Sequence, residues 1–208
     1  MQKLTDNIFG RNTPGINKKI KNHVIGIAGC GGLGSNAAVM LTRAGITNFV
    51  LVDCDKVEMS NLNRQHYFQE DVGKTKTHAL DKILKKINPN INIKIINKRL
   101  SGSDISEVFF NCTIIIEAFD SVESKSMIVK AFGNKQLSCK YLIGASGVAG
   151  IGAANSIQTQ QIAKNIFICG DFITESNPVN GLMATRVMIV AGHQANKVLE
   201  IIDSVEDD

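Results

Sequence analysis

The feature that most constrains the fold is a glycine-rich turn between a short apolar segment and a helix. Residues 23–30, HVIGIAGC, are apolar and rich in β-branched side chains, and Gly29, Gly31 and Gly34 have the spacing G-x-G-x-x-G. A turn of this kind brings backbone N–H groups and a helix N-terminus close to a phosphate. The segment therefore predicts a buried strand, a nucleotide-phosphate site and a helix, in that order.

The residues after this turn complete a βαβ unit. Gly32 adds another position without a side chain, which leaves room for a ligand against the backbone. Residues 33–44 have apolar side chains at helical spacing, and Gly45 is a typical residue to end the helix. Residues 48–55, NFVLVDCD, then predict a second buried strand, so that the whole unit spans about 30 residues.

Helices and strands alternate along the rest of the chain. The patterns predict helices within residues 73–90, 101–111, 121–136 and 181–204, and strands within 91–100, 113–120, 140–149, 152–160 and 166–172. Alternating strands and helices with apolar strands predict the α/β class, as a Rossmann-like, doubly wound, mainly parallel sheet with helices on both faces. Ligands of such sheets bind beyond the carboxyl ends of the strands, so the residues that follow each strand are the candidates for a site.

The composition is that of one globular domain. The chain has 208 residues, of which 44% are hydrophobic and 20% charged, so we expect residues 1–208 to form a single domain with a frayed acidic tail at 204–208. The sequence has no apolar run of about 18 residues and no apolar signal core, which predicts a cytoplasmic protein without a membrane span. The net charge of +4 suits anionic ligands and makes a nucleic acid an unexpected partner.

The five cysteines do not form a metal or disulfide pattern. No two of them have the spacing C-x-x-C, and their number is odd. These facts disfavour both a disulfide framework and a Cys₄ zinc site. We expect reduced, buried thiols, because free cysteine is among the residue types most often buried.

Two acidic residues follow the second predicted strand. Asp53 lies at its carboxyl end, where a carboxylate can accept hydrogen bonds from the hydroxyls of a ribose. The alternative role of Asp53 is to cap a helix or loop, and capping of the next turn is favoured for Asp55. The glycine-rich turn and Asp53 suit a dehydrogenase and an ATP-binding enzyme equally well.

The next loop separates these two classes of enzyme. Residues 60–68, SNLNRQHYF, are dense in amides and contain Arg64, and Lys76 follows at the start of a predicted helix. A single surface cation is usually only solvated, but two beside one strand end suit a polyphosphate from which a charged group departs. Hydride transfer needs no such pair. The two cations therefore favour ATP chemistry over a dehydrogenase. Tyr67 and Phe68 are expected to anchor the loop to the core.

A further carboxylate, Asp120, ends the fourth predicted strand. Because the ends of parallel strands meet at one edge of a sheet, Asp120 is expected in the same crevice. A carboxylate beside phosphates suits Mg²⁺, which takes oxygen ligands and needs only one or two from a protein. An N-cap role for the helix that follows is the alternative, and the two roles are compatible.

These motifs together resemble a known superfamily. GCGGLG, DCD, SNLNRQ, GKTK and EAFD, in this order and spacing, resemble the ubiquitin-activating (E1-like) ThiF/MoeB/HesA superfamily over about residues 5 to 200. Within it, TPGINKKIKN and CGDF…GLMATRVMIVAGHQAN are similar to the short ThiF type, whose members serve the sulfur carrier ThiS in thiamine biosynthesis. The longer relatives carry two Cys-x-x-Cys pairs that bind zinc; this chain has none, so no structural zinc is predicted.

The resemblance implies an activity: adenylylation, with Mg-ATP, of the C-terminal Gly carboxylate of a small ubiquitin-like carrier protein ending in Gly-Gly, with release of pyrophosphate. It also implies a homodimer, in which the N-terminal segment 1–22 crosses to the partner subunit. The implied residues are Gly29, Gly31, Gly32, Gly34 and Asp53 for ATP, Asn61, Arg64, Gln65 and Lys76 around the phosphates, Asp120 for Mg²⁺, and Arg11 for the active site of the partner subunit.

Catalysis of this kind needs no Ser-His-Asp set, because the attacking carboxylate is already ionised; positioning and charge stabilisation suffice. Some longer relatives link the activated carrier to a cysteine, for which Cys169 is the candidate here. Its apolar flanks favour a buried structural thiol instead. His66 and His193 are expected to be structural.

Three alternatives stay open beside the carrier-activating enzyme. The first is a related enzyme that adenylates a carboxylate on tRNA to cyclise threonylcarbamoyladenosine, which would need a strongly basic surface. The second is a non-catalytic E1-like subunit that only binds a carrier, and the presence of Arg64, Lys76 and Asp120 speaks against it. The third, a dehydrogenase, is disfavoured by the pair of cations.

Overall fold

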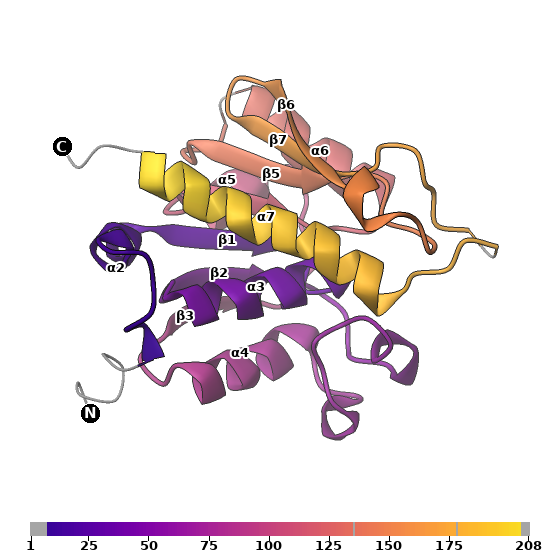
Figure 1. Ribbon diagram of the computed structural model, residues 1–208, viewed down its shortest axis with the longest axis horizontal. Coiled ribbons are helices and arrows are strands. Elements are labelled where there is room, and N and C mark those ends of the chain that lie inside the picture. Colours follow the sequence, from indigo (N-terminus) through magenta and orange to yellow (C-terminus); the bar gives the residue numbers. More distant parts are fainter. Residues whose placement is uncertain (1–7, 135, 178, 205–208) are drawn as a thin grey trace.

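The computed structural model describes residues 8–134, 136–177 and 179–204, and these contain one seven-stranded sheet (Figure 1). The strand order is β3-β2-β1-β4-β5-β7-β6. The strands are β1 (Val24–Ala28), β2 (Asn48–Val52), β3 (Asn92–Ile96), β4 (Ile114–Glu117), β5 (Tyr141–Ala145), β6 (Gln158–Ala163) and β7 (Ile166–Gly170). Six of them run parallel, and β6 pairs antiparallel with β7 at one edge.

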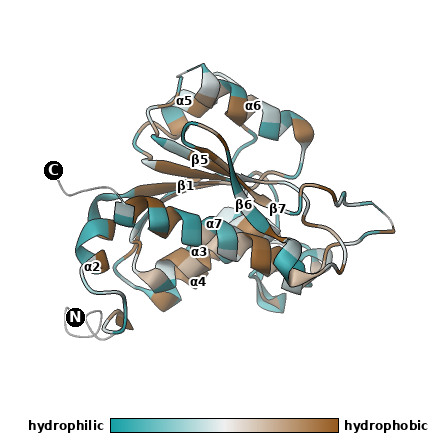
Figure 2. Cartoon of the chain, turned by 45° about the horizontal axis from the view of Figure 1, so that its top comes forward, coloured by the Kyte–Doolittle hydropathy of each residue, from teal (hydrophilic) through white to brown (hydrophobic). Residues whose placement is uncertain are grey.

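Helices cover both faces of this sheet, as Figure 2 shows. The segments α3 (Gly32–Ala44), α4 (Lys76–Ile87) and α7 (Ala184–Ser204) lie on one face, and α5 (Asp104–Val108) and α6 (Val122–Gly133) lie on the other. Shorter turns are α2 (Ile16–Lys19), η1 (Ile20–Asn22), η2 (Met59–Asn61), η3 (Gln69–Asp71) and η4 (Ala154–Ser156). The predicted Rossmann-like, mainly parallel α/β fold is confirmed. No helix in the described ranges is long and apolar enough to cross a membrane.

The central strands β1, β2, β4 and β5 are apolar on both sides because each of their faces packs against a layer of helices. Along β2, Phe49 and Leu51 belong to the core cluster under α3, α4 and α7. The alternate residues Val50 and Val52 belong to the cluster under α5 and α6. This two-sided burial explains why the central strands are continuous hydrophobic runs in the sequence rather than alternating ones.

The order of the strands creates a crevice at one end of the sheet. From β1 the chain goes to β2 and β3 on one side, and from β4 onward it continues on the other side. The connections after β1 and β4 therefore diverge, which leaves a gap beyond the carboxyl ends of these two strands. The observed strands are shorter than the predicted runs, and β6 extends three residues beyond the predicted segment 152–160. Polar residues that follow β2 and β4 form loops at this gap.

The described part of the N-terminal segment lies at the opposite end of the molecule. Ile20 is buried, Asn12 Nδ2 donates to the carbonyl oxygen of Ala44 at the end of α3 (2.8 Å), and Lys19 Nζ lies 3.0 Å from Asp203 Oδ1 near the end of α7. These contacts are with the segment's own chain. The first seven residues and the tail at 205–208 lie outside the described residues.

Gly34, in the first turn of α3, has no room for a side chain. A Cβ atom there would lie 1.8 Å from the carbonyl oxygen of Gly29 and 2.9 Å from Cγ2 of Ile27. The glycine therefore allows the helix to pack directly against the strand and the turn that precede it. This is the packing role expected for the last glycine of the motif.

We predict that Gly34→Ala destabilises the protein by at least about 2 kcal/mol, because the new methyl group overlaps backbone that cannot move independently. Gly133→Ala is the matched control: it lies in the last turn of α6 with nothing within 4 Å of the added Cβ, so it is expected to be neutral or slightly stabilising. Urea denaturation measures both variants. Equal midpoints for Gly34→Ala and the unmodified protein would contradict this packing role.

Candidate active site

A cleft of about 1010 Å³ lies beyond the carboxyl ends of the central strands, and most of the predicted site residues line it. This volume is at the upper end of the range for small-molecule sites. The predicted residues in its wall are Gly29, Gly31, Gly32, Asp53, Arg64, Gln65, Lys76 and Asp120. Gly34, Asn61 and Arg11 do not belong to the lining.

The glycine-rich turn forms the floor of the cleft and opens into the N-terminus of α3. Gly29 has φ +99°, and a Cβ atom there would lie 2.6 Å from the carbonyl oxygen of Ala118. Only glycine therefore fits between the ends of β1 and β4. Since α3 begins at Gly32, the free N–H groups of its first turn lie at the floor of the cleft, where an anion is favoured.

Asp53 holds this turn in place. Its Oδ2 accepts a hydrogen bond from the N–H of Cys30 (2.7 Å) and its Oδ1 accepts one from the N–H of Asp55 (2.8 Å). The residue is only 9% exposed, and burial raises the pKa of Asp53 although these hydrogen bonds and Lys76 oppose the rise. The loop-capping role and the position expected of a ribose ligand thus coincide, and a contact of Asp53 with ribose stays a prediction.

Lys76 reaches the cleft from the first residue of α4 and pairs with Asp55. Its Nζ lies 2.8 Å from Asp55 Oδ2, and its side chain is 9% exposed. Burial alone would lower the pKa of Lys76, but the hydrogen bond to Asp55 and the charges of Asp53, Asp55 and Asp120 together raise it. The same hydrogen bond lowers the pKa of Asp55. Asp55, which was expected to cap a turn, thus holds a charged ammonium at the cleft.

Arg64 lies half-buried in the loop after β2, with part of its guanidinium engaged. Its Nη1 donates to the carbonyl oxygen of Ser60 (3.0 Å) and to Oδ1 of Asn63 (2.8 Å). Asn63 in turn donates from Nδ2 to the carbonyl oxygen of Leu182, just before α7 (3.0 Å). The structure therefore gives Asn63 a role that the sequence left unexplained: it connects the arginine to the far wall of the cleft.

The amides of the same loop differ in their positions. Asn61 Oδ1 accepts from the N–H of Glu58 (3.1 Å), which closes the η2 turn beside the cleft, so its contact with phosphates stays a prediction. Gln65 does line the cleft, and its buried Oε1 has no hydrogen-bond partner among the described residues. A buried amide without a partner is costly, which suits a group that binds a ligand.

Of the two aromatic residues expected to anchor this loop, only one does so. The Tyr67 hydroxyl donates to the carbonyl oxygen of Cys30 (2.7 Å), and its ring is buried. Phe68 is 54% exposed, so the expectation for it was wrong. The chain turns outward after Tyr67 because the N–H of Phe68 bonds to Asp71 Oδ2 (3.2 Å) in the η3 turn.

Asp120 lies in the cleft beyond β4 with its carboxylate exposed. The helix α6 is capped by its neighbour, since Ser121 Oγ accepts from the N–H of Ser124 (3.2 Å). The alternative N-cap role of Asp120 is therefore taken by Ser121. Within the described ranges Asp120 forms no hydrogen bond, so both of its oxygens are available to a cation.

Mg²⁺ fits this donor set as a partly hydrated ion. Mg²⁺ is usually held by one or two carboxylates, with water and phosphate oxygens as the other ligands. Asp120 can supply the carboxylate, and the anion-favouring turn at Gly32 lies in the same cleft. Another group of possible ligands, Asp53, Cys54 and Asp55, lies nearby, but Asp53 already accepts two backbone hydrogen bonds and Asp55 pairs with Lys76.

The cleft also contains cations that the sequence did not single out. Lys98 and Arg99 follow β3, and Lys125 comes from α6. Lys125 Nζ lies 3.1 Å from Oε2 of Glu117, a carboxylate that is 4% exposed at the end of β4. The predicted strand 91–100 included Lys98 and Arg99, and they follow the strand only because β3 ends at Ile96. Lys125 carries no local signal, because it reaches the cleft only through the packing of α6.

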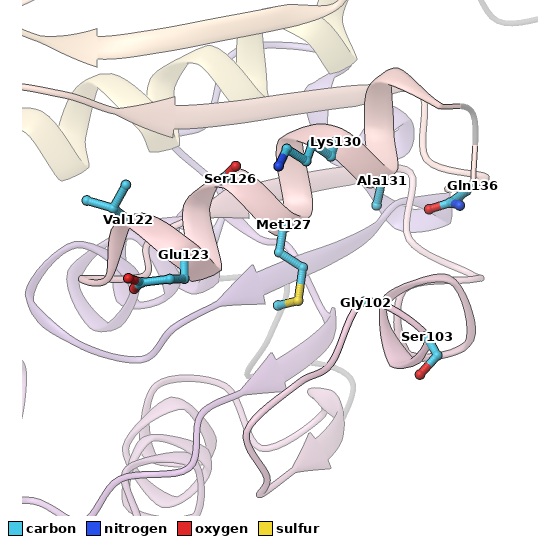
Figure 3. Close-up of a pocket in the computed structure, with 9 residues that line it drawn as sticks. All are labelled: Gly102, Ser103, Val122, Glu123, Ser126, Met127, Lys130, Ala131 and Gln136. Atoms are coloured by element: carbon cyan, nitrogen blue, oxygen red, sulfur yellow. The ribbon is translucent and has the colours of Figure 1, made fainter.

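A second hollow, between α5 and α6, contains no predicted site residue. Figure 3 shows its lining, which includes Ser103, Glu123, Met127 and Lys130. Met127 and Val122 also border the main cleft. The hollow is thus a neighbour of the cleft rather than the place where the predicted motifs meet.

Arg11 and Cys169 stand apart from the cleft. Arg11 is exposed in the N-terminal segment, at the other end of the molecule, so a catalytic contribution from it would require another chain and stays a prediction. Cys169 is fully buried in β7, and burial raises its pKa to about 11. Its thiol is therefore protonated near neutral pH, which disfavours a covalent link to a carrier.

The order of the strands and the glycine-rich turn at the switch point define a Rossmann-like α/β protein. The ThiF family model matches residues 6–208, so this chain belongs to the ThiF family, whose members are E1-like adenylyltransferases.

Curated relatives match only part of the chain. Ubiquitin-like modifier-activating enzyme 5 of Mus musculus is 39% identical over 94 residues, which are 45% of this chain and 23% of that protein. The enzyme of the same name from Dictyostelium discoideum is 41% identical over 92 residues, which are 44% of this chain and 24% of that protein. The match thus spans about a quarter of the length of these relatives.

Two solved structures from E. coli share the fold. The tRNA N6-threonylcarbamoyladenosine dehydratase TcdA in complex with ATP has a TM-score of 0.82 at 20% identity, and the alignment covers 97% of this chain and 93% of that one. MccB with ATP has a TM-score of 0.70 at 24% identity, and the alignment covers 90% of this chain and 57% of that one. At these identities the likeness shows the fold alone.

The exposed cysteine at the cleft gives a direct test of the site's geometry. Cys54 is exposed and the other four cysteines are buried. Partial burial, and after it the charge of Asp55, raise the pKa of Cys54. We predict that a thiol reagent labels one cysteine per folded chain, faster as the pH rises because the thiolate is the reactive form. Cys54→Ser should abolish this labelling, whereas Cys169→Ser should leave it unchanged. Rapid labelling of the folded Cys54→Ser protein would contradict the structure.

Proposed function

We propose that this protein is an adenylyltransferase that uses Mg-ATP to activate the C-terminal Gly carboxylate of a small ubiquitin-like carrier protein. As the particular substrate we propose a ThiS-like sulfur carrier ending in Gly-Gly, in thiamine biosynthesis. The observation that carries the proposal is that Arg64 and Lys76 line the same cleft as the glycine-rich turn and Asp120. Two cations, an anion-binding turn and a free carboxylate are the set that ATP activation requires.

In this proposal the turn at Gly29, Gly31 and Gly32 holds the phosphates, supported by Gly34, and Asp53 accepts from the ribose. Arg64, Gln65 and Lys76 contact the phosphates. Asp120 would hold Mg²⁺, which neutralises phosphate charge when it is bound. The family membership supports ATP as the substrate, and the TcdA and MccB structures that share the fold contain ATP.

The reaction needs charge stabilisation more than proton transfer. The carrier carboxylate is ionised at neutral pH, so it attacks the α-phosphate without a general base, and the bond to pyrophosphate breaks. The charge on the departing pyrophosphate increases as this bond breaks. Lys76 is suited to stabilise it, because the surrounding carboxylates keep its ammonium protonated and its low exposure weakens competition from water.

We also propose that residues 1–208 act as one domain in a homodimer, with Arg11 serving the partner's site. Support for this comes from the position of Arg11, which is exposed and lies far from the cleft of its own chain. A contribution from Arg11 therefore depends on a second subunit. The exposed side chain makes no hydrogen bond in the described part of the chain.

The mutational prediction concerns the two cations. Arg64→Ala and Lys76→Ala should each lower carrier-dependent ATP–pyrophosphate exchange by about 10²- to 10³-fold, as expected when a group that stabilises developing charge is removed. Lys85→Ala is the control, since Lys85 lies on the exposed side of α4 and, among the described residues, pairs only with Asp81. It should exchange at the unmodified rate.

Circular dichroism and thermal unfolding establish that the variants are folded. Lys76→Ala leaves Asp55 without its partner, but Asp55 is half exposed, so only a small loss of stability is expected. A folded Lys76→Ala protein that exchanges pyrophosphate at the unmodified rate would refute the assigned phosphate site.

A second candidate function is adenylylation of a carboxylate on tRNA. It is favoured by the likeness to TcdA, which covers nearly the whole of both chains. The modest net charge of +4 speaks against it, because tRNA binding rests on many phosphate contacts. We predict pyrophosphate exchange with a ThiS-type carrier ending in Gly-Gly and none with the same carrier lacking these glycines. Exchange stimulated only by tRNA carrying threonylcarbamoyladenosine would overturn this choice of substrate.

A further inference from the structure

A buried ion pair between Asp171 and Arg186 lies behind one wall of the cleft, outside the proposed catalytic set. Arg186 Nη2 lies 2.5 Å from Asp171 Oδ2, and the two side chains are 4% and 7% exposed. Asp171 follows β7, and Arg186 is in the first turn of α7. The pair therefore joins two segments that meet only in the folded chain.

Asp171 organises the loop after β7. Its Oδ1 accepts from the N–H groups of Ile173 (2.9 Å) and Thr174 (2.8 Å), and its Oδ2 accepts from the Thr174 hydroxyl (2.9 Å). A Cβ atom at Gly147 would lie 1.9 Å from Asp171 Oδ1, so the loop after β5 packs directly on this carboxylate. Thr174 and Gly147 both line the cleft.

Arg186 extends this connection to a third segment. Its guanidinium donates to the carbonyl oxygen of Ala153 (3.3 Å) and to Ser156 Oγ (3.2 Å). A Cβ atom at Gly152 would lie 2.8 Å from Arg186 Cζ, so the backbone there lies against the guanidinium. The loops after β5 and β7 are thus attached to one helix turn.

The same helix turn touches the glycine-rich turn. Val187, the neighbour of Arg186, has its Cγ1 3.0 Å from where a Cβ of Gly32 would lie. One turn of α7 therefore contacts the phosphate-binding floor through Val187 and the opposite wall through Arg186. This turn of α7 therefore fixes the distance between the glycine-rich turn and the loops after β5 and β7.

This ion pair is expected to contribute little net stability to the attachment of the helix. A cation in the first turn of a helix opposes the helix dipole, and a buried ion pair is often no more stable than apolar side chains of similar size. In addition, Arg186 Nε is buried without a partner in the described residues. Local rules of stability are most often broken where function requires a particular geometry.

We propose that Asp171 and Arg186 are a positioning pair that holds the wall of the cleft where the acceptor carboxylate enters. This rests on the proposed function. In the proposed function Asp53 and the glycine-rich turn hold the nucleotide over the ends of β2 and β1, so the acceptor approaches from the side of β4, β5 and β7, which lie next to β1 in the sheet. That side is formed by the loops that the pair joins, including Gly147 and Thr174.

The test uses Arg186→Lys and Asp171→Asn in the full-length protein. Lysine keeps the charge but cannot bind three partners through a planar fork. Asparagine keeps the size but loses the ion pair. In both variants we expect the KM for a ThiS-type carrier ending in Gly-Gly to rise about tenfold, with the KM for ATP changed less than about twofold. Hydrogen exchange at residues 146–156 and 171–177 should be faster, with the exchange of β1 and α3 unchanged.

Ile128→Val is the control for general destabilisation. Ile128 is fully buried on α6, in the core of the other face, so this change should alter neither KM nor the exchange of the two loops. Unchanged exchange of both loops in Arg186→Lys and Asp171→Asn would overturn the positioning of the wall. Equal increases in the KM for ATP and for the carrier would overturn its specificity for the acceptor side.

The hydrogen-exchange arm also separates this proposal from the function on which it rests. Hydrogen exchange can be measured without a carrier. Calorimetric titration with ATP alone then measures whether the variants still bind the nucleotide. If the unmodified protein shows no carrier-dependent exchange of pyrophosphate, the proposed function fails, and the acceptor role of the pair fails with it. Faster hydrogen exchange in the variants would then still establish that the pair holds the wall.

Discussion

The site depends on the hydrogen bonds that the Asp53 carboxylate accepts from the backbone. One joins it to the N–H of Cys30 in the glycine-rich turn, and the other joins it to the N–H of Asp55. The ends of β1 and β2 are thus fixed to each other at the place where the sheet opens. Asp55 then holds Lys76, and the Tyr67 hydroxyl reaches the Cys30 carbonyl from the next loop. This one buried carboxylate thus orders the backbone around the proposed phosphate position, and the hydrogen bonds that it accepts offset part of the free energy lost on its burial.

The charges of the cleft are balanced in a way that suits a polyanionic ligand with a metal ion. Lys76 is paired with Asp55, and Lys125 with Glu117, so each of these cations is held in position before a ligand arrives. Asp120 differs from the paired carboxylates Asp55 and Glu117, since it forms no hydrogen bond in the described ranges. Ordered cations reduce the reorganisation needed as charge develops, which is how an electrostatic site lowers a barrier. A metal ion bound at this carboxylate would displace no hydrogen bond of the described residues.

The fold and most of the cleft are predictable from the sequence because both follow a local rule. Apolar runs that end in glycine or acidic residues predicted β1, β2 and β4, and the residues that follow them converge because parallel strands end at one edge. Other features escaped because they have no local signal. The antiparallel direction of β6, the arrival of Lys125 from within a helix, the outward turn at Phe68 and the link from Asn63 to Leu182 depend on contacts between distant segments.

By itself, the sequence determined the class of fold, the nucleotide-type turn and the family, since glycine spacing, strand hydrophobicity and the polar residues after strands are written in consecutive positions. Only the tertiary structure decided which side chains contact one another and which are buried. It assigned the cap of α6 to Ser121 instead of Asp120, paired Asp55 with Lys76, and buried Cys169 away from the cleft. It also joined Asp171 to Arg186. The physical reason is that hydrogen bonds and ion pairs depend on distances of a few ångströms between atoms, and such distances between remote residues exist only after the sheet and its helices have packed.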